Sequence, residues 1–309
     1  MKRCTVLVAL MTIGWFSLSI AGFQGTAPGP SAPALQATKI EKVKDNLYII
    51  TGASDLKAFS GGNTAVFITD AGVVLVDTKL PGWGPAILDR IKTVTNKPVT
   101  TIINTHSHND HSGSNEFFPS NVDSVVHENA KANMVKMEEF KGDKAKYLPK
   151  RTFKDKLSIG KGKDQIDLYY FGPGHTNGDT FIVFPALRTM HAGDMFAQKM
   201  LPLIDTMNGG SVVGYPQTLA KAAEAIRNVD TVIPGHRQIA TWNEFREFAA
   251  FTKDFVDFAR TSANSKKTVA QAAAEYKVPA KFSGYVVTID PSLATAAGIL
   301  QTAYDELKK

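Results

Sequence analysis

The sequence predicts an α+β fold in which mixed sheets are covered by helices. Strand-like apolar runs fall mainly into two groups, near residues 39–77 and 166–192, and helical patterns separate and follow them. Strand-rich halves of this kind bury their sheets under helices. The chain has 309 residues, of which 43% are hydrophobic and 21% charged, so it can form a sizeable core. We expect one compact domain over residues 39–309.

The N-terminus has the pattern of a secretory signal peptide. A basic Met-Lys-Arg start is followed by an uncharged apolar run, and Ser19 and Ala21 are the small residues of a cleavage site before Gly22. The alternative is an uncleaved anchor, because the run approaches the length that spans a bilayer. We expect residues 1–21 to be removed and residues 22–38, rich in Gly, Pro, Ala and Ser, to form a flexible leader.

The first half of the expected domain consists of strand pairs followed by alternating helices and strands. Turn residues separate the members of each pair, and helical spacing marks the longer polar-apolar runs. The expected strands are 39–43, 47–51, 63–70, 72–77, 99–105 and 122–126, and the expected helices are 85–95 and 127–140.

The second half repeats the mixture and ends in helices. Strands are expected at 166–171, 180–184, 188–192 and 231–233, with a helix at 215–228. From about Asn243 onward the chain is mostly helical, with a strongly periodic segment at 243–259.

Three of the seven histidines lie within six positions of "THSHNDHSG", residues 105–113. His106, His108 and His111, with Asp110, directly follow an expected strand, so they sit on a loop at its carboxyl end, where α/β sites are usually built. The alternative is a polar loop that carries imidazoles by chance. So many donors crowded into one turn are hard to satisfy without a cation, which favours a metal site.

Further donors follow later strands in the same manner. His175 follows a Gly-Pro-Gly turn, Asp194 ends a strand, and His236 follows a Pro-Gly turn. Each alone is more often a hydrogen-bonded loop residue, but together with the cluster they favour a metal. The only cysteine, Cys4, lies in the expected signal peptide, so nitrogen and oxygen must supply the ligands of the mature chain.

The motif order H-x-H-x-D-H, H, D, G-H resembles the metallo-β-lactamase superfamily. "THSHNDHSG", "GPGHTNGDT", "HAGDMF" and "VIPGHRQ" match its motifs, and "VVLVDT" matches the strand before them, so the resemblance covers about residues 40–240. It implies a four-layer αββα sandwich with metals at one edge. By resemblance the first metal's ligands are His106, His108 and His175, the second's are Asp110, His111 and His236, and Asp194 bridges them.

The resemblance also implies chemistry. Zinc suits these donors, with two ions per chain, although iron or manganese is chemically acceptable. Two metals can share a hydroxide that attacks an acyl bond at neutral pH, and Asp110 is the expected catalytic residue that orients it.

Two residues are candidates for substrate contact. Phe59 lies in a possible flap, residues 53–63, which could equally be a solvated loop packed on itself. Arg237 makes the last motif "GHR" where the family more often has "GHG", and it could crowd or charge the mouth of the site. His127 and His191 are interpreted as structural.

The expected function is an exported dinuclear zinc-dependent hydrolase, periplasmic or secreted, that uses a metal-bound hydroxide to cleave a β-lactam, lactone, ester or thioester. The alternatives are a mononuclear iron sulfur dioxygenase of the same fold and a non-catalytic metal-binding protein. The expected partner is a small-molecule substrate. A formal charge of only +6 and the export signal argue against nucleic acid, and no stable membrane anchor is expected after signal cleavage. The sequence leaves the oligomeric state open.

Overall fold

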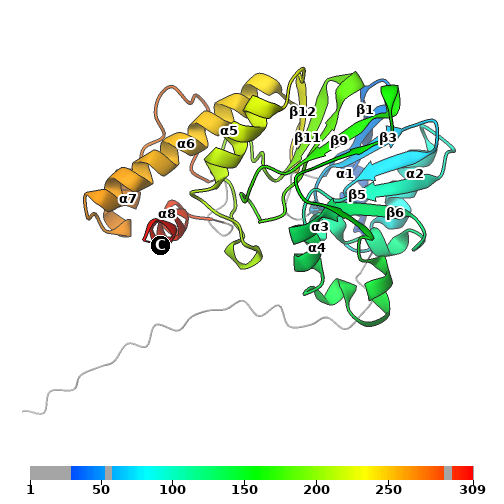
Figure 1. Ribbon diagram of the computed structural model, residues 1–309, viewed down its shortest axis with the longest axis horizontal. Coiled ribbons are helices and arrows are strands. Elements are labelled where there is room, and N and C mark those ends of the chain that lie inside the picture. Colours follow the sequence, from blue (N-terminus) through cyan, green and yellow to red (C-terminus); the bar gives the residue numbers. More distant parts are fainter. Residues whose placement is uncertain (1–28, 53–57, 289–293, 309) are drawn as a thin grey trace, which may run out of the picture.

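A computed structural model describes residues 29–52, 58–288 and 294–308 of the chain (Figure 1). The expected signal peptide, residues 1–21, lies outside this described part. Among the described residues, no helix combines the length and apolar character needed to cross a membrane.

Two β-sheets form the centre of the molecule. The first has seven strands in the order β1-β2-β3-β4-β5-β6-β7, and the second has six in the order β13-β12-β11-β10-β9-β8. The strands of the first are β1 (Ile40–Lys44), β2 (Leu47–Ile50), β3 (Thr64–Ile68), β4 (Val73–Val76), β5 (Val99–Ile103), β6 (Asp123–His127) and β7 (Arg151–Phe153). The strands of the second are β8 (Lys156–Ile159), β9 (Ile166–Tyr169), β10 (Phe181–Phe184), β11 (Thr189–Gly193), β12 (Thr231–Pro234) and β13 (Ala240–Thr241).

The described residues also contain eight α-helices and several short 3-10 helices, which lie before, between and after the strands. The α-helices are α1 (Ala32–Ala37), α2 (Gly84–Lys92), α3 (Asn109–Ser112), α4 (Glu128–Met134), α5 (Tyr215–Ala225), α6 (Trp242–Asn264), α7 (Val269–Glu275) and α8 (Ala296–Leu307). The longest, α6, starts at a capping box in which Thr241 and Glu244 satisfy each other's backbone N–H groups.

The two sheets pack face to face across one apolar layer. Leu47, Phe67 and Val76 of the first sheet belong to the same buried cluster as Leu168 and Phe184 of the second. The ring centroids of Phe67 and Phe184 lie 5.0 Å apart, in an edge-to-face contact across this layer.

Helices cover the outer faces of both sheets. Ile87 of α2 packs on the outer side of the first sheet, in a cluster with Val66 and Leu75. Phe245 and Phe248 of α6 bury the outer side of the second sheet together with residues of α5, α7 and α8. The expected αββα sandwich is therefore confirmed, and Figure 1 shows α6, α7 and α8 extending beyond the edge of the sandwich.

Parallel strand pairs set the position of the site. β4 pairs in parallel with β5, and β11 pairs in parallel with β12. The carboxyl ends of the strands in each parallel pair therefore share one edge, where the chain can bring polar loops together. The segments after β5, β9, β11 and β12 carry the candidate ligands.

Some elements differ from the expectation. Residues 32–37 of the expected flexible leader form α1, which is capped by Ser31 and held by Arg90 of α2, whose guanidinium donates to the Leu35 and Thr38 carbonyls. Order therefore begins before Ile40. The expected helix at 127–140 is shorter, with α4 ending at Met134, and the exposed edge strands β7 and β8 were not expected.

Candidate metal centre

The histidine cluster begins where β5 ends, and Asp77 shapes it. Asp77 lies at the end of β4 with a positive φ of 64°, and its buried carboxylate accepts from Thr105 N–H at 2.8 Å and Thr105 Oγ1 at 2.7 Å. The same carboxylate lies 2.7 Å from His111 Nδ1. Asp77 therefore fixes both ends of the histidine turn, and α3 starts directly after His108.

Three histidines form the first group of candidate ligands. One ring nitrogen from each of His106, His108 and His175 lies within 4.8 Å of the others. His175 Nε2 and His108 Nδ1 are 3.0 Å apart. The loop after β9 thus brings His175 against the turn after β5.

A second group lies beside the first. Asp110, His111 and His236 also place one donor each within 4.8 Å of one another. His236 Nε2 is 3.3 Å from both Asp110 Oδ2 and His111 Nε2. His236 is delivered by the turn after β12.

Asp194 lies between the two groups. Its Oδ1 is 3.3 Å from His111 Nε2 and 3.4 Å from His236 Nε2, whereas its Oδ2 is 3.6 Å from His175 Nε2. The two oxygens therefore face different groups, which is the arrangement required of a bridging carboxylate.

The seven donors have the chemistry of metal ligands. His106 Nε2 is buried without a hydrogen-bond partner among the described residues. Buried polar atoms are rarely left unpaired, so this nitrogen indicates a ligand. Nitrogen and oxygen donors without thiolate suit zinc, as they also suit manganese or iron.

Burial and close charged neighbours shift the pKa values of the clustered histidines and carboxylates. Burial, followed by repulsion from His111, lowers the pKa of His106 well below its usual value. Burial opposes protonation of His236 too, but Asp194 and Asp110 overcome it and raise its pKa to about 9. Burial likewise opposes the ionisation of Asp194, yet His236 and His111 hold its pKa well below its usual range. Protonated histidines thus supply, beside the ionised carboxylates, the positive charge that metal ions would supply at this site.

Three histidines have outer partners that hold the second ring nitrogen. His111 Nδ1 meets Asp77, His108 Nε2 lies 2.7 Å from Asp205 Oδ2, and His175 Nδ1 donates to the Leu203 carbonyl at 2.8 Å. Such partners fix the orientation of ligand imidazoles. These three residues were not predicted from the sequence as parts of the site. Asp77 could have been noticed because it ends a buried strand, whereas nothing local marks Leu203 or Asp205.

The two candidate substrate-binding residues make different contacts, and only one of them contacts a candidate ligand. Phe59 is 37% exposed and stacks on His236 with ring centroids 5.6 Å apart, so it stands beside the second group. Arg237 follows His236 with a positive φ of 70°, and its guanidinium lies 3.3 Å from Met200 Sδ. The structure thus places Phe59 at the site, and it gives Arg237 a contact on the neighbouring loop.

The two histidines interpreted as structural stand outside the metal groups. His127 stacks on Tyr170 at 3.8 Å and lies 2.8 Å from the Lys154 carbonyl. His191 is buried and accepts from Gly193 N–H at 3.1 Å. Burial lowers the pKa of His191 to about 4, so it stays neutral near pH 7.

Comparisons with known proteins agree with this geometry. The chain is 28% identical over 228 residues to a metallo-β-lactamase type 2 of Elizabethkingia meningoseptica, which covers 72% of this chain and 87% of that protein. It is 30% identical over 183 residues to the 2,4-dinitroanisole O-demethylase subunit alpha of Nocardioides sp. (strain JS1661), covering 57% of this chain and 51% of that protein.

Solved structures with the same fold fall into two kinds by coverage. A metallo-β-lactamase from Pontibacter korlensis matches with a TM-score of 0.60 and 21% identity, over 70% of this chain and 99% of that one. A stereoselective inverting sec-alkylsulfatase from Pseudomonas sp. matches with a TM-score of 0.72 and 15% identity, over 91% of this chain and 53% of that one.

The family model for the metallo-β-lactamase superfamily matches residues 59–236. This segment is more than half of the chain, and it begins at Phe59, ends at His236 and contains all seven donors. The chain therefore belongs to the metallo-β-lactamase superfamily.

Proposed function

We propose that this protein is an exported dinuclear zinc-dependent hydrolase that cleaves an acyl bond in a small molecule. The observation that carries the proposal is the donor arrangement: two groups of three donors, with Asp194 facing both. Relatives named as metallo-β-lactamases support hydrolysis as the reaction class.

When bound, two zinc ions would supply an activated hydroxide and polarise the substrate carbonyl. The first would be held by the three-histidine group, the second by Asp110, His111 and His236. No serine or cysteine nucleophile is needed in such a site.

Asp110 has the position of the proton carrier. Its Oδ2 lies 3.3 Å from His236 Nε2 and 3.5 Å from His111 Nε2. Burial opposes its ionisation, but the neighbouring His111 and His236 lower the pKa of Asp110. The ionised carboxylate can orient the attacking hydroxide at Oδ2, accept its proton as the new C–O bond forms, and pass that proton to the leaving nitrogen, oxygen or sulfur as the acyl bond breaks.

Phe59 is the candidate for substrate contact, because it offers an exposed aromatic face next to His236. It would pack on an apolar part of a substrate held at the second group. Phe59→Ala should raise KM more than it lowers kcat.

Export is proposed from the N-terminal pattern of residues 1–21. N-terminal sequencing of the exported protein should find Gly22 at or near the start. An intact Met1 on membrane-retained protein would contradict cleavage.

A substrate panel tests the reaction class. Purified zinc-loaded protein is offered a β-lactam, a lactone, an ester, a thioester and a phosphodiester, with metal content measured in parallel. An aryl methyl ether and a secondary alkyl sulfate are added because two similar proteins are named for such substrates. Acyl hydrolysis with two zinc ions per chain is expected. A single iron in the protein before zinc loading, with oxygen uptake during turnover of a sulfur-containing substrate, would instead support a sulfur dioxygenase. Two metals without any turnover would support a binding protein.

A further inference from the structure

One loop supports the first metal group from outside. Residues 201–213 run from the segment after β11 to the start of α5. Within this loop, the Leu203 carbonyl accepts from His175 Nδ1 at 2.8 Å, and Asp205 Oδ2 lies 2.7 Å from His108 Nε2. Two of the three histidines in that group are thus oriented by this support loop.

The carboxylate of Asp205 is itself held in place. Its Oδ1 accepts from Met207 N–H at 3.0 Å, and its Oδ2 accepts from Asn208 Nδ2 at 2.6 Å. The Asp205 backbone N–H donates to the His175 carbonyl at 2.8 Å. The support loop is therefore bonded to the ligand turn at several points, and a shift of the loop would move both histidines.

The far end of the support loop is clamped by the last helix. Glu306 of α8 accepts from Ser211 Oγ at 2.6 Å, Val212 N–H at 2.9 Å and Val213 N–H at 3.0 Å. These partners are 93 to 95 positions away in sequence. Hydrogen bonds to an ionised carboxylate are about twice as strong as neutral ones, so three on one side chain form a firm anchor.

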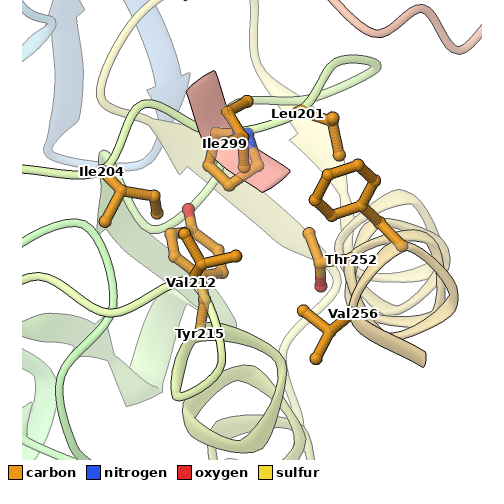
Figure 2. Close-up of a pocket in the computed structure, with 9 residues that line it drawn as sticks. Leu201, Ile204, Val212, Tyr215, Thr252, Val256 and Ile299 are labelled. Carbon is orange, nitrogen blue, oxygen red and sulfur yellow. The ribbon is translucent and has the colours of Figure 1, made fainter. Parts of the chain in front are cut away.

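The side of the support loop that faces the helices is apolar. Figure 2 shows Ile204 and Val212 of the loop around a small cavity with Tyr215 of α5, Val256 of α6 and Ile299 of α8. Apolar contacts of this kind are not directional, so they do not define the loop's register by themselves. The three bonds from Glu306 supply that definition.

A second connection runs from the same helices to the bridging residue. The Tyr215 hydroxyl, at the start of α5, donates to the Asp194 carbonyl at 2.8 Å. Because residues 211–213 lead directly into α5, the Glu306 clamp also fixes the position of this tyrosine.

We propose that Glu306 is a positioning residue of the metal centre, and that α8 therefore helps to hold the candidate ligands in place. The inference rests on the proposed function, in which the three-histidine group holds zinc. α8 lies outside residues 59–236, the part that the family model matches, so the clamp connects the helical C-terminus to the segment that carries the seven donors.

Glu306→Ala tests the proposal, with two matched variants on the same helix. Asp305→Asn removes an exposed carboxylate that accepts hydrogen bonds from Gln301 and Lys308. Leu300→Ala removes a fully buried side chain that does not line the cavity, so it lowers stability without touching the clamp. Zinc dissociation constants are measured for both equivalents by competition with a chromophoric chelator.

Glu306→Ala should weaken one of the two zinc equivalents roughly tenfold, the lower end for loss of an outer partner of a ligand. Asp205→Ala should weaken the same equivalent, and the double variant should lose less than the sum, since both act through one loop. Asp305→Asn and Leu300→Ala should stay within about twofold of the wild type. Unchanged zinc binding in Glu306→Ala, or an equal loss in Leu300→Ala, would overturn the proposal.

Amide hydrogen exchange on the metal-free proteins separates this inference from the proposed function. Glu306→Ala should increase the exchange rates of the amides at residues 203–213. Leu300→Ala should increase the exchange rates of these amides no more than those of the other amides in the helical region. If the wild type binds no metal, the proposed function fails while exchange still shows whether the clamp orders the loop. Unchanged exchange at 203–213 would sink the clamp itself.

Discussion

Asp194 holds the central position among the seven donors, because its two carboxylate oxygens face different groups of histidines. A bridging carboxylate reduces the repulsion between two cations. Asp194→Ala and Asp194→Asn should therefore weaken the second metal most, because the first would keep three histidines. Metal content after dialysis against dilute zinc checks this. His191→Ala, three residues earlier on β11, is the control and should keep both metals; the opposite pattern would mean that the ligand assignment on this strand is wrong.

Lys79 is the other unusual residue near the site, since it is fully buried with a positive φ of 61°. Its Nζ donates to the Gly62 carbonyl at 2.7 Å and the Thr51 carbonyl at 3.1 Å, which ties the base of the segment that carries Phe59. Burial lowers the pKa of Lys79 from 10.5 to about 7.

This pKa predicts how stability depends on pH. Between about pH 7 and 10.5 the unfolded chain keeps the lysine proton that the folded chain has lost, so the free energy of unfolding should rise with pH. Lys79→Met should remove this contribution and give a flatter profile. Urea unfolding of the metal-free proteins at pH 7, 8 and 9 measures the difference. Parallel profiles for the two proteins would contradict a depressed pKa.

At the scale of elements, the turn after β12 brings His236 to the site through a close approach. A Cβ on Gly235 would lie 1.9 Å from Asp194 Oδ1 and 2.8 Å from the Gly193 carbonyl carbon. Gly235→Ala should displace the bridging carboxylate and weaken zinc binding roughly tenfold or more. Gly298→Ala, at the start of α8 with only a 3.3 Å contact to Thr295 Oγ1, should bind zinc normally. Competition titrations measure the zinc affinity of both variants. If Gly235→Ala and Gly298→Ala bind zinc equally well, the turn after β12 can move to accept a Cβ and the prediction is wrong.

The elements also show what the sequence could and could not predict. Strands of the sandwich core were placed within a few residues because their apolar runs end in turns, as in β3 and β4. β7 and β8 were missed because their exposed, lysine- and arginine-containing sequences lack an apolar period. α1 was missed because its Pro- and Ala-rich sequence resembles a leader, and contacts with distant residues, such as those of Arg90, hold it in place.

The same division holds for the site. The seven donors were predicted because each follows a strand in a recognisable motif. Asp205 was not, because it meets His108 across 97 positions of sequence and no local pattern relates the two. The Glu306 clamp was missed for the same reason. Ligands that lie in motifs are therefore visible in sequence, whereas the residues that hold them depend on how distant segments pack.

At the scale of the whole molecule, the seven candidate ligands come from both sheets of the sandwich. His106, His108, Asp110 and His111 follow β5 of the first sheet, whereas His175, Asp194 and His236 follow strands of the second sheet. Direct polar links join the halves near the site, such as Asn63 Nδ2 to the Pro234 carbonyl at 2.9 Å and Thr180 N–H to the Thr105 carbonyl at 2.8 Å. Metal ions bound to both sets would add cross-links that the unfolded chain cannot form with the same affinity.

Zinc should therefore raise the thermal stability of the whole domain. A ligand that binds only the folded state stabilises it by about 2.7 kcal/mol at a free concentration of 100 times Kd, so Tm should climb with zinc concentration. Chelation should reverse the rise. His236→Ala should retain part of the zinc-dependent shift through the three-histidine group, and His106→Ala combined with His236→Ala should abolish it. His127→Ala serves as the control, because its ring lies outside both groups and its variant should show the full shift. If the Tm of the wild type does not change with zinc concentration, metal ions do not link the two halves of the sandwich.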